Sequence, residues 1–219
     1  MTAAASHALH DRWNSLCERV GVFKSAHESD VAFEMLSTLY ANPPRKYHTL
    51  EHIGQVLGAF DSARMLADEK DVVEFAIWLH DCVYFAERPD NEERSADAAG
   101  MIAGLLGCGA EFLALVRPCI MATRHSATPE KGDASLVADL DLTILGSPRE
   151  EYDRYAAAIR AEFAFAPDEQ YVPGRIAFLQ RMVDKERIFS TPHFFARMER
   201  GARGNLYREM DGLERVAKG

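Results

Sequence analysis

Histidine and aspartate residues interrupt three apolar stretches of the sequence. They are His48 and His52 in the first stretch, His80 and Asp81 in the second, and Asp139 and Asp141 in the third. Burying an imidazole or a carboxylate costs several kcal/mol unless the group is paired or bound to a metal. Three such interruptions in one chain therefore favour a shared metal site built from histidine and aspartate.

Each of these patterns also has a purely structural interpretation when it is taken alone. Two histidines four residues apart lie on one face of a helix, where they are more often a core or surface pair than metal ligands. A His-Asp dipeptide is as often a helix cap or a pair that fixes the imidazole tautomer. An aspartate in an apolar helix can be a buried cap or an ion-pair partner. Only the combination indicates a metal.

The elements that must position these residues are helices. Apolar side chains recur at helical spacing along most of the chain and predict an all-α fold. The expected helices are Asp11–Val20, Val31–Tyr40, Thr49–Leu66, Asp71–Tyr84, Glu92–Leu106, Glu111–Thr123, Ala134–Leu145, Arg149–Phe163, Pro173–Asp184 and His193–Leu213. Only Val83–Phe85 looks like a strand, and the glycines of Arg200–Asn205 suggest a helix irregularity or an exposed patch. We expect one domain over residues 1–219, with the helices of 149–213 packed on a motif core at about 45–146.

The order of the motifs resembles the HD superfamily of metal-dependent phosphohydrolases. Glu51–Val56 is similar to the first-histidine helix of that family, Leu79-His80-Asp81 to its defining doublet, and Val137–Leu142 to its closing aspartate segment. More narrowly, residues 45–146 resemble an uncharacterised bacterial branch of predicted HD phosphohydrolases. The resemblance implies an HD-domain-like helical bundle that hydrolyses a phosphoester of a small metabolite or nucleotide.

The resemblance also implies a set of metal ligands. They are His52, His80, Asp81 and one of the two aspartates, Asp139 or Asp141. We favour Asp141, because the last ligand of the family is usually the second aspartate of the Asp-x-Asp pair. Asp139 would then orient a histidine or a water. Dinuclear members have additional histidines before this segment, and here His125 alone lies there, so one ion is favoured over two.

The ligand types restrict the metal and its chemistry. Imidazole and carboxylate without thiolate favour Mn²⁺, Fe²⁺, Co²⁺ or Ni²⁺ over a structural zinc site, with Mg²⁺ and Zn²⁺ left open. Such an ion polarises a phosphoryl group and activates a bound water. Asp81 is the expected proton acceptor, and His48 and Glu92 are further catalytic candidates.

Residues beside the motifs are candidates for substrate binding. They are Arg45, Arg94, Arg124, His125, Tyr47 and Tyr84. Arginine suits bidentate phosphate recognition, although each of these arginines is equally compatible with a surface ion pair. The tyrosines are expected to line the pocket.

Charge and composition exclude several classes of protein. The 219 residues include 25 Lys and Arg against 34 Asp and Glu, a net charge of −9, so a nucleic-acid polymer is not the expected partner. Neither a signal peptide nor a membrane span is recognisable, and the four dispersed cysteines indicate reduced thiols, which together predict a cytoplasmic protein. A homodimer stays open. The alternatives to a phosphohydrolase are a metal-bearing nucleotide sensor without turnover and a di-iron HD oxygenase.

Overall fold

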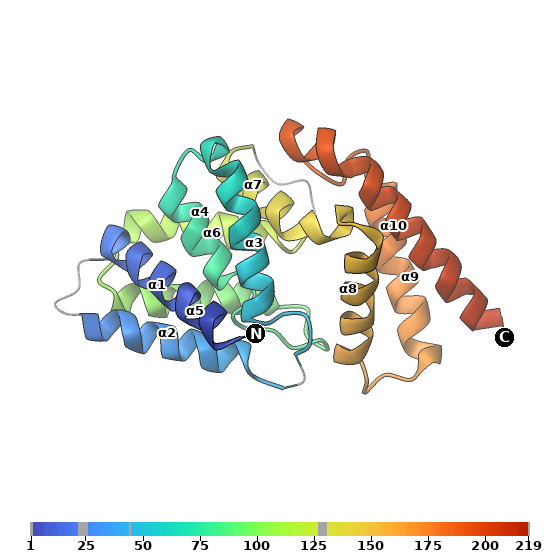
Figure 1. The fold of residues 1–219 in the computed structure, drawn as a ribbon, viewed down its shortest axis with the longest axis horizontal. Helices are drawn as coiled ribbons and strands as arrows, with labels where there is room; N and C mark the ends of the chain where they lie inside the picture. Colours follow the sequence, from blue (N-terminus) through green and yellow to red (C-terminus); the bar gives the residue numbers. More distant parts are fainter. Residues whose placement is uncertain (1, 22–25, 44, 127–130, 219) are drawn as a thin grey trace. The chain divides into compact units, whose positions relative to one another are not determined.

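The computed structural model describes residues 2–21, 26–43, 45–126 and 131–218. Over these ranges the chain forms ten α-helices, two short 3-10 helices and no strand, which confirms the all-α prediction (Figure 1). The strand-like run Val83–Phe85 is irregular backbone. The chain divides into two compact units, Met1–Leu140 and Asp141–Gly219. Compact units can fold together or separately, so the single domain stays a prediction.

In the first unit, several helices pack around one buried helix, α4 (Lys70–Leu79). The elements of this unit are α1 (Ala3–Val20), α2 (Ala26–Tyr40), α3 (Leu50–Ala63), η1 (Arg64–Leu66), α4, α5 (Asn91–Leu105), α6 (Ala110–Ala122) and most of α7 (Asp133–Asp141). Helix α4 contacts α1, α3, α5 and α6 (Figure 1). Every residue from Val72 to Leu79 is buried. The ring of Trp13 packs on Phe75 and Trp78 with centroids 5.9 and 5.4 Å away. This aromatic contact joins α1 to the helix that leads into the His80-Asp81 pair.

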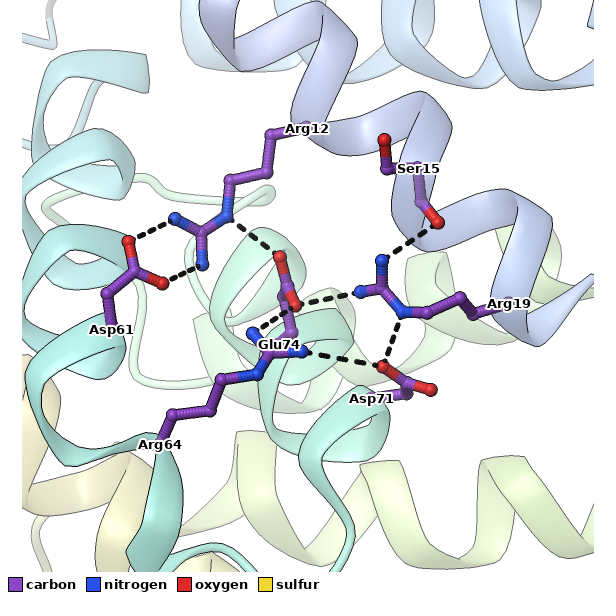
Figure 2. Close-up of polar contacts among 7 residues, drawn as sticks. All are labelled: Arg12, Ser15, Arg19, Asp61, Arg64, Asp71 and Glu74. Carbon is purple, nitrogen blue, oxygen red and sulfur yellow. Dashed lines mark hydrogen bonds and ion pairs between the residues drawn. The ribbon is translucent and has the colours of Figure 1, made fainter.

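Three arginines, two on α1 and one on η1, pair with one buried carboxylate of α4. Figure 2 shows Glu74, 2% exposed, accepting from Arg12 at 2.8 Å and from Arg19 and Arg64 at 2.9 Å. Arg12 also binds Asp61 on α3 through both terminal nitrogens. Because a carboxylate this deeply buried needs compensating charge, the network fixes α3 and α4 to one another. These two helices carry His52 and lead into His80.

The second unit is built on one long helix. Its elements are η2 (Leu142–Gly146), α8 (Arg149–Glu162), α9 (Asp168–Asp184) and α10 (Pro192–Lys218), and α10 contacts the other three. Asn205 on α10 donates to the carbonyls of Leu145 and Ser147 at 2.8 and 2.9 Å. A Cβ placed at Gly146 would lie 2.7 Å from Cβ of Met198, so glycine is required for this close approach. The irregularity expected at Arg200–Asn205 is wrong, because α10 runs unbroken through it.

The aromatic residues of α10 divide between the core and the surface. Phe194 is buried in the second unit, Phe195 is half-buried, and Tyr207 is 51% exposed. Across the described part of the chain, each helix is too short or too polar to cross a bilayer.

Candidate metal centre

His52 occupies the first turn of α3. The side chain of Thr49 caps this helix by accepting from the backbone N–H of Glu51 at 3.3 Å, so the helix begins at Leu50. His48 therefore precedes the helix, and the prediction that His48 and His52 share one helical face is wrong. The two rings still lie close, with centroids 6.1 Å apart. His52 itself is 2% exposed.

His80 and Asp81 follow α4 directly rather than lying within it. The predicted helix to Tyr84 is too long, because α4 ends at Leu79 with His80 as its C-cap. Nδ1 of His80 lies 2.9 Å from the carbonyl oxygen of Ile77. A carbonyl can only accept, so Nδ1 carries the proton and the Nε2 of a neutral His80 keeps its lone pair. This contact fixes the tautomer as second partners of metal-binding histidines do.

Four side chains bring their potential ligand atoms together at this point. One ligand atom from each of His52, His80, Asp81 and Asp141 lies within 4.8 Å of every other. The two Nε2 atoms are 3.3 Å apart, and Oδ2 of Asp81 lies 3.2 Å from Nε2 of His80 and 3.7 Å from Nε2 of His52. Ligands on an ion with bonds of about 2.1 Å are spaced by roughly 3–4.2 Å. The donor set fits a metal ion, and so do the three distances among His52, His80 and Asp81.

The aspartate of this group is Asp141, the one that the sequence analysis favours. Asp141 is the last residue of α7, and the boundary between the two compact units falls directly before it. Asp139 lies two residues earlier, about 200° around the helix, and is 1% exposed. One helix cannot point both side chains in the same direction, so only one of the two joins the group.

Aromatic rings stand beside the imidazoles. The ring of His48 stacks on Tyr84 at 3.9 Å between centroids, and Tyr47 lies 4.7 Å from the ring of His52. All three of Tyr47, His48 and Tyr84 are half-buried. They present planar surfaces next to the group that can contact the organic part of a ligand.

Glu92 lies in the first turn of α5, the next helix, where the charge of Asp81 acts on it. Burial and the negative charge of Asp81 raise the pKa of the Glu92 carboxyl above its usual value. Its pKa is thus linked to a member of the cluster, which fits its selection as a catalytic candidate. A raised carboxyl pKa is typical of general acids.

The three arginines selected for phosphate binding all have acceptors within the protein. Arg94 donates to Asp90 at 2.9 Å, and Arg124 pairs with Glu93. Both pairs are largely exposed, as expected for surface ion pairs. Arg45 is buried and donates to backbone carbonyls. A substrate phosphate would have to compete with these partners.

His125 lies in the wall of a separate pocket. Its backbone is in the left-handed region at φ 53°, where a non-glycine residue is uncommon. The pocket has a volume of about 540 Å³ and is also lined by Cys119 and Asp133. None of its described lining residues belongs to the four-residue group.

The second unit holds a group of buried polar side chains in contact that was not predicted from the sequence. Burial raises the pKa of Tyr155, Arg175 opposes this, and the negative charges of Glu209 and Asp141 add to the rise. Arg175 in turn donates to Glu209 at 2.8 Å. An arginine and a tyrosine in an amphipathic helical pattern resemble ordinary surface or core residues, so no local signal marked them.

Comparison with known proteins adds no family to this geometry: no protein-family model matches the chain, and no curated protein is significantly similar to it.

Proposed function

We propose that the chain is a metal-dependent phosphohydrolase of the HD type, with His52, His80, Asp81 and Asp141 as the ligands of a divalent ion. The observation that carries the proposal is the convergence of two imidazole nitrogens and two carboxylates within 4.8 Å of one another. The order of these residues along the chain matches the resemblance described above. Mn²⁺, Fe²⁺, Co²⁺ or Ni²⁺ suits such a nitrogen and oxygen donor set.

A divalent ion held by these residues supplies Lewis acidity toward a phosphoryl oxygen and lowers the pKa of a bound water. The protein residues do the rest of the work. His80 offers Nε2 as a lone-pair donor because its Nδ1 proton is held by Ile77. The Asp81 side chain keeps 14% exposure, so its carboxylate can exchange a proton with water that enters the site.

Residues around the group suit the remaining steps. Burial raises the pKa of the Glu92 carboxyl, which favours the protonated form that a general acid for the leaving alcohol requires. The rings of Tyr47, His48 and Tyr84 limit the access of bulk water and contact the organic part of a small phosphorylated substrate.

Release of inorganic phosphate from a panel of phosphomonoesters tests the proposal. The protein loaded with Mn²⁺, Co²⁺ or Ni²⁺ should hydrolyse at least one member, a chelator should abolish the activity, and the metal should restore it. A protein that binds metal and nucleotides but releases no phosphate across a broad panel would be a sensor instead.

A further inference from the structure

Arg45 holds the backbone of the His80-Asp81 turn. Its Nη1 donates to the carbonyl oxygen of Asp81 at 2.7 Å and to that of His48 at 3.1 Å, and its Nη2 donates to the carbonyl of Cys82 at 2.9 Å. One planar guanidinium thus joins the segment that precedes α3 to the segment that follows α4. These two segments carry His48 and Asp81.

The surroundings of Arg45 keep this guanidinium in place. Arg45 is only 9% exposed, and its guanidinium carbon lies 5.2 Å from the ring centroid of Tyr40 and 5.8 Å from that of Tyr84. The hydroxyl of Tyr40 donates to the carbonyl of Trp78 at 2.9 Å. Tyr40 and Arg45 together therefore satisfy three carbonyls around the His80-Asp81 turn.

Arg45 lies beside the C-terminal end of α4. His80 still has helical backbone angles, and its N–H donates to the carbonyl oxygen of Ala76, so the chain leaves the helix after His80. Arg45 binds the carbonyls of Asp81 and Cys82 at this point, where a positive charge also interacts favourably with the helix dipole. The turn brings Oδ2 of Asp81 to 3.2 Å from Nε2 of His80.

We propose that Arg45 is a positioning residue, which holds the His80-Asp81 turn in the geometry of metal ligands, rather than a residue that binds the phosphate of a substrate. The inference rests on the proposed metal centre. Its physical basis is the fork of the guanidinium, which reaches three carbonyls at once. A lysine ammonium is a single point donor and cannot hold the same three oxygens in place.

Arg203 provides a matched control. It too is an arginine that binds three backbone carbonyls around a helix end, that of Val183 in the last turn of α9 at 2.7 Å and those of Lys185 and Glu186 beyond it at 2.8 and 3.1 Å. All of these residues belong to the second unit and none is in the metal-ligand group. Arg203→Lys removes a comparable carbonyl clamp and leaves the His80-Asp81 turn unchanged.

The experiment compares Co²⁺ binding to chelator-treated wild type, Arg45→Lys, Tyr40→Phe and Arg203→Lys by isothermal titration calorimetry. Circular dichroism first establishes that each variant is folded. We expect Arg45→Lys to bind Co²⁺ about 10–100-fold more weakly, the range for groups that orient metal ligands. Tyr40→Phe should weaken Co²⁺ binding by a smaller factor. Arg203→Lys should leave the Co²⁺ affinity within about twofold of wild type. Tyr40→Phe keeps the inference testable if Arg45→Lys does not fold.

Two outcomes would overturn the inference. One leaves the metal centre standing and the other does not. Unchanged Co²⁺ affinity in Arg45→Lys, with a raised KM and an unaltered kcat for a phosphoester, would make Arg45 a substrate-binding residue while the metal centre stands. Wild-type protein that binds no Co²⁺ would refute the metal centre and the role of Arg45 with it.

Discussion

The Nε2 atoms of His52 and His80 face each other at 3.3 Å, and both lie within 3.7 Å of the same carboxylate oxygen of Asp81. Nε2 of His80 cannot be a donor in the neutral ring, because its proton is on the Nδ1 that faces Ile77. Nε2 of His80 therefore accepts, either from an N–H on Nε2 of His52 or from a positive ion that both lone pairs and the carboxylate share. Metal binding distinguishes these two arrangements.

The two aspartates of α7 should differ in their effect on metal binding. Asp141→Asn removes a charged ligand and should abolish tight binding of Mn²⁺ or Co²⁺. Asp139→Asn should retain the metal with an affinity or activity about 10–100-fold lower, because a buried carboxylate there acts through another group. Equilibrium dialysis with metal analysis measures both variants. The reverse order of effects would make Asp139 the ligand.

Glu92→Gln should stabilise the metal-free protein at neutral pH. Burial and the charge of Asp81 raise the pKa of Glu92 in the folded state, so the folded chain binds this proton more tightly than the unfolded chain. The stability contribution is full below the unfolded pKa of about 4.3 and is lost as the pH rises through the folded pKa. Glutamine does not ionise. The Tm of the variant should therefore exceed that of the wild type at pH 7 and equal it at pH 4.

The exposed Glu87→Gln serves as the control for this pH dependence. It should show no comparable gain at pH 7. If Glu92→Gln lowers the Tm at pH 7, the carboxylate is stabilised by its surroundings and is a poor general acid.

Glu74→Gln should cost about 3 kcal/mol of unfolding free energy. The substitution removes the one buried carboxylate among Arg12, Arg19 and Arg64, and breaking a buried ion pair leaves uncompensated charge (Figure 2). The arginines are 23–38% exposed, so water offsets part of the loss. Asp71→Asn, at a carboxylate 36% exposed, should cost less than about 1 kcal/mol. Urea denaturation measures both, and equal losses would contradict this account of the network.

Two glycine substitutions should have opposite effects. A Cβ at Gly146 meets Cβ of Met198 at 2.7 Å, so Gly146→Ala should destabilise the protein by about 1–3 kcal/mol. Gly204 lies within α10 with nothing in reach of a Cβ, so Gly204→Ala should add roughly 0.4–1 kcal/mol by restricting the unfolded chain. Thermal unfolding checks both values. A stabilised Gly146→Ala would mean that α10 does not cross η2 closely.

Thiol reactivity tests the burial of the cysteines. Burial raises the pKa of Cys17 to about 11 and those of Cys82 and Cys119 to about 12, so little thiolate is present at pH 8. In the native protein a thiol reagent should therefore modify the half-buried Cys108 first. Mass spectrometry of the labelled peptides identifies the modified sites, and rapid labelling of Cys82 would contradict its burial between α4 and α5.

The sequence predicts the helices well because their cause is local. Apolar side chains at helical spacing mark a buried face wherever that face packs, and the interruptions by His52, His80 and Asp141 stand out against it. The turn that follows α4 has a distant partner. Arg45 satisfies the carbonyls beyond Leu79 from 36 or more positions away, and no property of Asp71–Tyr84 reveals this.

Other errors also come from contacts between distant residues. Gly201 reads as a break in a helix, yet it lies in an unbroken α10 where a Cβ would come 3.2 Å from the carbonyl oxygen of Gly146. His48 stays outside α3 for a local reason, because Thr49 caps the helix, which begins at Leu50. An arginine beside a motif is free to bind a phosphate only if no acceptor of the protein itself already binds its guanidinium. The sequence does not show whether such an acceptor lies nearby in the fold.

Metal content of the purified protein is the direct test of the metal centre. Wild-type chain dialysed against Mn²⁺ or Co²⁺ should retain about one ion per molecule, and His52→Ala should retain almost none while its circular dichroism stays helical. His10→Ala, at a histidine paired with Asp30 away from the group, should bind metal as the wild type does. Equal retention of metal in wild type and His52→Ala would contradict the metal centre.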